Sequence, residues 1–60
     1  MLTIEQIENM AAETIRGIAP EYRAELVKET RRRYYGPADD AAAVIDLMQN
    51  IAAVRHYPTK

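Results

Sequence analysis

Glycine and proline occur at few places in the chain, and they divide it into three stretches without helix breakers. Gly17 and Pro20 form the first interruption, Gly36-Pro37 the second, and Pro58 lies near the end. The stretches between them are rich in Ala, Glu, Arg, Leu and Met, which favour helices. No alternating apolar pattern or hairpin dipeptide indicates a strand. The sequence therefore predicts an all-α fold.

The predicted layout is a single small domain over 1–60, with three antiparallel helices joined by short turns. We expect helices over about 3–17, 20–35 and 38–56, followed by a frayed tail over 57–60. In the first helix, Thr3 and Gln6 have the spacing of a capping box. Pro20 suits the first position of the second helix, and Gly36 is expected to end that helix in a left-handed conformation.

The third predicted helix is apolar around an unusually large part of its circumference. Asp39 and Asp40 suit its N-terminus and Arg55 its C-terminus. On a helical wheel its apolar residues span about 180°, more than one neighbouring helix covers. We therefore expect part of this surface to mediate self-association, through Ile45, Leu47, Ile51 and Val54.

The length of the chain also favours self-association. A chain of 60 residues buries only about 60% of its unfolded surface and usually needs extra stabilisation. Cysteine is absent, which excludes disulfides and fits a reducing, cytoplasmic location. No stretch has the length of a membrane span, and the glutamates near the N-terminus are atypical of a signal peptide. We expect a homodimer that does not enter membranes.

The run "TRRRYYGPADD", residues 30–40, poses the main functional question. Consecutive helical side chains diverge by about 100°, so the three arginines point in different directions. Glu29 lies four residues before Arg33, a favourable order for an ion pair. An antiparallel first helix would also bring Glu5 and Glu8 close. These observations favour charges neutralised within the fold, and Glu21, Glu25 and Glu29 are expected to form a solvated strip.

Two functional interpretations of the basic run remain open. Tyrosine beside arginine is typical of protein interfaces, so one interpretation is a partner-binding site at Lys28, Arg31, Arg32 and Tyr35. Tyr34 is instead expected in the core. The alternative is a nucleic-acid patch made of Arg23, Lys28, Arg31, Arg32 and Arg33. The net charge of −1 gives no general attraction to phosphate polymers, which favours the protein partner.

Signs of catalysis and of a cofactor are missing. The chain has no serine or cysteine, and its single histidine, His56, lies at a predicted helix end. No phosphate-binding loop or metal-binding motif occurs. The sequence therefore predicts a non-catalytic module without cofactor or metal, which acts as an adaptor, regulator or inhibitor by binding a larger protein.

Overall fold

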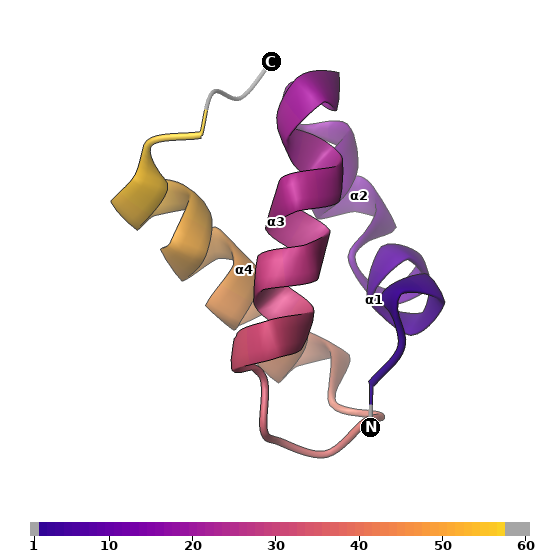
Figure 1. Cartoon of the computed structure of the whole chain (residues 1–60). Coiled ribbons are helices and arrows are strands. Elements are labelled where there is room, and N and C mark those ends of the chain that lie inside the picture. Colours follow the sequence, from indigo (N-terminus) through magenta and orange to yellow (C-terminus); the bar gives the residue numbers. More distant parts are fainter. Residues whose placement is uncertain (1, 58–60) are drawn as a thin grey trace.

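The computed structural model describes residues 2–57 and is compact and all-helical over that range (Figure 1). It has four helices: α1 (Ile4–Met10), α2 (Ala12–Arg16), α3 (Pro20–Arg33) and α4 (Ala41–Arg55). The predicted all-α class is confirmed. The predicted number of helices is not, because the first one is divided into α1 and the five-residue α2.

The first helix begins as predicted. The backbone N–H of Gln6 donates to the Thr3 hydroxyl at 3.1 Å, and the backbone N–H of Thr3 donates to the Gln6 side-chain oxygen at 2.7 Å. This reciprocal pair satisfies two N–H groups that a helix start leaves without partners. The capping box thus fixes the N-terminal end of α1 at Ile4.

The division between α1 and α2 occurs at Ala11. Its backbone leaves the helical region, with φ −107° and ψ 21°, and its side chain is only 1% exposed. Alanine favours helices more than any other residue, so no local signal marks this break. The prediction of one continuous helix over 3–17 is wrong here because core packing at Ala11 overrides local preference.

Helix α3 begins at Pro20, as predicted, but ends at Arg33 rather than at residue 35. Tyr34 is extended, and its hydroxyl donates to the Pro37 carbonyl at 2.6 Å. Gly36 does not adopt a positive φ, so the predicted left-handed ending is wrong. A Cβ at Gly36 would lie 2.5 Å from the Tyr34 hydroxyl oxygen, so a larger residue there would require the Tyr34 side chain to move.

Helix α4 begins three residues later than predicted, where Asp40 accepts a hydrogen bond from the backbone N–H of Ala43 at 3.0 Å. It ends at Arg55 and is capped by His56, which is left-handed with φ 57°. Tyr57 is half-buried and stacks on Tyr22, with ring centroids 5.3 Å apart. The predicted fraying is therefore wrong for Tyr57, and residues 58–60 of that prediction lie outside the described range.

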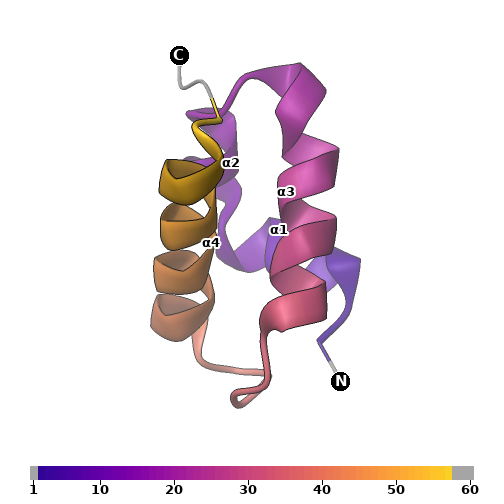
Figure 2. The same cartoon turned by 60° about the vertical axis from the view of Figure 1, so that its left-hand side comes forward.

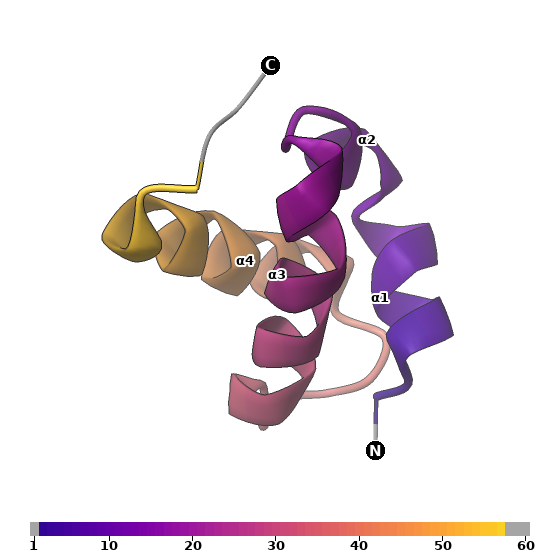
Figure 3. The same ribbon diagram turned by 45° about the horizontal axis from the view of Figure 1, so that its top comes forward.

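The core lies where α4 packs against both α3 and α1. The chain runs down α3 and back up α4 (Figure 2), but α4 crosses α3 at a steep angle (Figure 3), so the predicted antiparallel arrangement is wrong for this pair. Figure 3 shows α1 lying along the other side of α3. The buried apolar side chains are Leu2, Ile7, Ala11, Ile18, Leu26, Val27, Val44, Met48 and Ile51. Within the part of the chain that is described, no helix combines the length and apolar character of a bilayer span.

Candidate functional site

The arginine run divides between the two sides of α3. On the side facing α4, Glu29 accepts hydrogen bonds from three arginines. The Arg32 guanidinium donates to both carboxylate oxygens at 2.7 Å, Arg33 donates at 3.1 Å and Arg55 at 3.3 Å. Arg55 comes from the last turn of α4, so one carboxylate joins the C-terminal ends of both long helices. The predicted pair of Glu29 and Arg33 is confirmed within this larger network.

Glu29 is well enclosed, with only 8% of its surface exposed. Hydrogen bonding from Arg32 holds the pKa of the Glu29 carboxyl below its ordinary value. Burial opposes this effect, and the charges of Arg32, Arg33 and Arg55 reinforce it. The prediction that Glu21, Glu25 and Glu29 share a solvated strip is therefore wrong for Glu29, which turns towards α4 because Arg55 meets it there.

The predicted neutralisation by Glu5 and Glu8 is replaced by other contacts. Among residues 2–57, the ion pairs of the arginine run all involve Glu29. Arg31 instead donates its Nε–H to the Leu2 carbonyl at 3.1 Å, which ties α3 to the segment before α1. Its guanidinium therefore stays on the side of α3 that faces α1.

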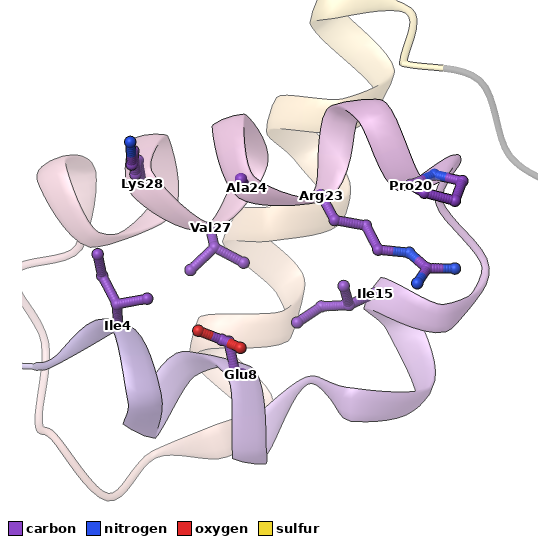
Figure 4. Close-up of a pocket in the computed structure, with 8 residues that line it drawn as sticks. All are labelled: Ile4, Glu8, Ile15, Pro20, Arg23, Ala24, Val27 and Lys28. Atoms are coloured by element: carbon purple, nitrogen blue, oxygen red, sulfur yellow. The ribbon is translucent and has the colours of Figure 1, made fainter.

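An open groove of about 390 Å³ lies between α3 and the helices α1 and α2, on the side of α3 that faces α1 (Figure 4). The half-buried Ile4 and Ile15 supply apolar surface on one wall and the exposed Ala24 supplies it on α3, while Val27 also borders the groove but is only 3% exposed and belongs to the core. The polar residues of the lining are Glu8, Arg23 and Lys28. This lining is an apolar centre with a few charged positions, the composition expected of a binding site.

A second hollow of about 290 Å³ adjoins the groove at the C-terminal part of α3. It is lined by Ile4, Lys28, Arg31 and Arg32, and it shares Ile4 and Lys28 with the groove. The two hollows therefore form one surface, apolar in the middle and basic at one end. We call this surface, lined by the residues of both hollows, the α1–α3 groove.

Three of the four residues predicted for partner binding are brought together at the basic end of the α1–α3 groove, namely Lys28, Arg31 and Arg32. The fourth, Tyr35, lies beyond the end of α3 and is 94% exposed. Its predicted place beside Lys28 and Arg31 requires a helix that continues to residue 35. Tyr35 is a large exposed side chain, but it does not line the groove.

The five residues of the predicted nucleic-acid patch are dispersed. Arg23 donates to the Ile18 carbonyl at 2.9 Å and to the Arg16 carbonyl at 3.2 Å, and so holds the turn between α2 and α3. Arg33 lies in the Glu29 network on the opposite side of α3. Only Lys28, Arg31 and Arg32 remain adjacent.

The residues predicted for self-association occupy different environments. Ile51 is only 3% exposed and belongs to the core, so it offers little surface to a second chain. Ile45 and Leu47 are half-buried, and Val54 is 76% exposed. Leu47 and Val54 line a shallow hollow together with Arg33. The prediction is wrong for Ile51 because α3 and α1 together cover more of α4 than a single neighbouring helix would.

The walls of the groove show what sequence reasoning missed. On α3, Pro20, Ala24 and Lys28 are four residues apart and lie on one strip, which a helical wheel can reveal. On the opposite wall, Ile4 and Glu8 belong to α1 and Ile15 belongs to α2, and the break between these helices at Ala11 has no sequence signal. The pairing of these two strips could not be predicted, because it depends on how α1 lies against α3.

Comparison of the chain with protein-family models, with curated proteins and with solved structures finds no match. The function is therefore inferred from the chemistry of the site alone.

Proposed function

We propose that this chain is a non-catalytic protein-interaction module that binds a larger partner through the α1–α3 groove. The observation that supports this function is the open apolar centre of the groove, bounded by Ile4, Ile15 and Ala24 and flanked by charged side chains. Binding energy at protein interfaces is concentrated in apolar pockets near their centre, surrounded by polar residues. An adaptor, regulator or inhibitor that works in the cytoplasm fits this arrangement.

The proposal includes self-association, on a surface separate from the groove. Leu47 and the exposed Val54 on α4 would form that contact, with Ile45 on the other edge of the helix. A homodimer formed there would leave the groove of each copy open to a partner. Light scattering should give a mass above that of one chain, and the melting temperature should rise with protein concentration. A melting temperature independent of concentration would argue against the dimer.

The partner function can be tested with a photo-crosslinking amino acid placed at Ala24, inside the groove. The matched control is the same amino acid at Ala12, which is also an exposed alanine in a helix but lies outside the groove lining. In the native host, a specific protein should be crosslinked from position 24 and not from position 12. That protein, once purified, should bind the wild-type chain and lose affinity for Ala24→Gln. Equal crosslinking from both positions would contradict the proposal.

Nucleic-acid binding is the second candidate, because Lys28, Arg31 and Arg32 lie side by side. Phosphate neutralisation by these three cations would give an affinity that falls steeply with salt. Retention of a generic oligonucleotide at low salt, and its loss in Lys28→Glu/Arg32→Glu, would favour this candidate. We expect no retention, because Glu29 shares the charge of Arg32.

A further inference from the structure

The length of the α1–α3 groove matches a short helix. Along α3 its lining runs from Pro20 to Arg32. At 1.5 Å per residue this is about 18 Å, the length of about three helical turns. A helix that lies in such a groove presents apolar side chains at positions i, i+3 or i+4, and i+7. Ile15, Ala24 and Ile4 lie along the groove and could receive them in turn (Figure 4).

The charges of the groove select the partner further. Lys28 and Arg31 form no ion pair within residues 2–57, whereas Arg32 is paired with both carboxylate oxygens of Glu29. The basic end therefore holds more positive charge than the fold neutralises. Glu8 lies on the α1 wall near the middle of the groove, also without an ion pair in the described range. An occupant needs carboxylates at one end and no acidic group beside Glu8.

We infer that the α1–α3 groove binds an acidic amphipathic helix of about three turns from another protein. Its apolar side chains lie against Ile4, Ile15 and Ala24, and carboxylates at one end contact Lys28 and Arg31. This inference rests on the proposed function and adds the chemistry of the partner. Charge complementarity of this kind mainly sets specificity and the rate of association.

A pair of designed peptides tests the inference. Each is a fluorescein-labelled helix of about 14 residues with leucines along one face. One peptide has glutamates in a terminal turn and the other has lysines at the same positions. Anisotropy titrations at low salt should show the acidic peptide binding at least about tenfold more tightly than the basic one. Equal binding of the two peptides, or binding of neither, would overturn the inference.

Variants of the groove locate the bound peptide. Ala24→Gln should weaken binding of the acidic peptide by about tenfold, because the longer side chain fills the apolar centre, whereas Ala12→Gln should leave binding unchanged. Lys28→Glu should weaken binding of the acidic peptide, and Glu8→Gln should leave this binding unchanged. Binding that survives both Ala24→Gln and Lys28→Glu would place the peptide elsewhere and refute the assigned site.

Two further outcomes separate the occupants of the groove. Displacement of the acidic peptide by a generic oligonucleotide at physiological salt would identify the basic end as a phosphate site and overturn the helix assignment. A dimer that light scattering detects for the wild type but not for Ala24→Gln would identify a second copy as the occupant and equally overturn it. If neither peptide binds but crosslinking from position 24 succeeds, only the chemistry of the partner is wrong. If that crosslinking fails, the proposed function itself is wrong.

Discussion

The two sides of α3 use the same kind of side chain in opposite ways. On the side facing α4, Arg32 and Arg33 meet an enclosed carboxylate, and Arg55 completes the network from the neighbouring helix. On the side facing α1, Lys28 and Arg31 border an open apolar groove. The comparison teaches that a run of basic residues cannot be read as one patch, because helical geometry distributes it between a structural and a potential binding role.

The sharpest test of the structural side is Glu29→Gln. The amide removes the negative charge from a site that three arginines contact, so their charges repel one another without compensation. We expect a fall in melting temperature larger than the fall from neutralising any exposed charge on α3. Glu25→Gln is the matched control, since Glu25 is exposed and has one long contact, 3.9 Å from Arg55. Equal falls for the two variants would show that Glu29 has no special structural role.

Acid titration examines the same carboxylate without mutation. The pKa of Glu29 is lowered in the folded state, so its contribution to stability is present above the ordinary pKa of about 4.3 and is lost as pH falls through the lowered folded value. Thermal melts at a series of pH values should therefore show wild type losing its advantage over Glu29→Gln below that ordinary pKa. A difference between the two proteins that stays constant into strong acid would contradict the lowered pKa.

Arg33→Gln and Lys28→Gln compare one cation from each side of α3. Arg33 pairs with Glu29 at 3.1 Å and is half exposed, so its loss should cost about 0.3 to 1 kcal/mol of unfolding free energy. Lys28→Gln should change stability by less than about 0.3 kcal/mol, because it relieves repulsion from Arg32 four residues on. Urea denaturation measures both variants. A larger loss of unfolding free energy from Lys28→Gln than from Arg33→Gln would show that the side of α3 facing α1, and not the side facing α4, has the structural role.

Ala24→Gln alters the groove alone and is expected to have little effect on stability. Ala24 is exposed on α3, and glutamine is also a good helix former. Unfolding free energy should therefore stay within about 0.5 kcal/mol of wild type, and circular dichroism should show unchanged helix content. A clear loss of stability would mean that Ala24 packs structurally, and the groove would then need a probe at another position.

Much of the architecture is predictable because its signals are local. The capping box at Thr3, the proline at the start of α3 and the aspartate before α4 each act within a few residues, and the structure has helices beginning at all three places. The class of the fold follows from these signals together with the absence of strand patterns. The error at the end of α3 arises where a side-chain contact outweighs the helical preference of the backbone, because Tyr34 is extended and its hydroxyl bonds to the Pro37 carbonyl.

The site is harder to predict because it depends on neighbours distant in sequence. Composition points to Lys28, Arg31 and Arg32, and helix geometry correctly separates Arg33 from them. The enclosure of Glu29 requires Arg55, which is 26 residues away along the chain. The groove requires the orientation of α1 against α3, and the break between α1 and α2 that shapes one wall is invisible in a sequence rich in helix formers. Pattern reasoning fails at such points because tertiary packing outweighs propensity.

The stacking of Tyr22 on Tyr57 gives the molecule a built-in spectroscopic reporter. The chain contains four tyrosines and neither tryptophan nor phenylalanine, so its near-ultraviolet circular dichroism comes from tyrosine alone. Such a signal requires fixed tertiary packing and disappears when rings become free to rotate. Release of Tyr57 from the start of α3 could therefore be followed without any label, separately from the helix content recorded in the far ultraviolet.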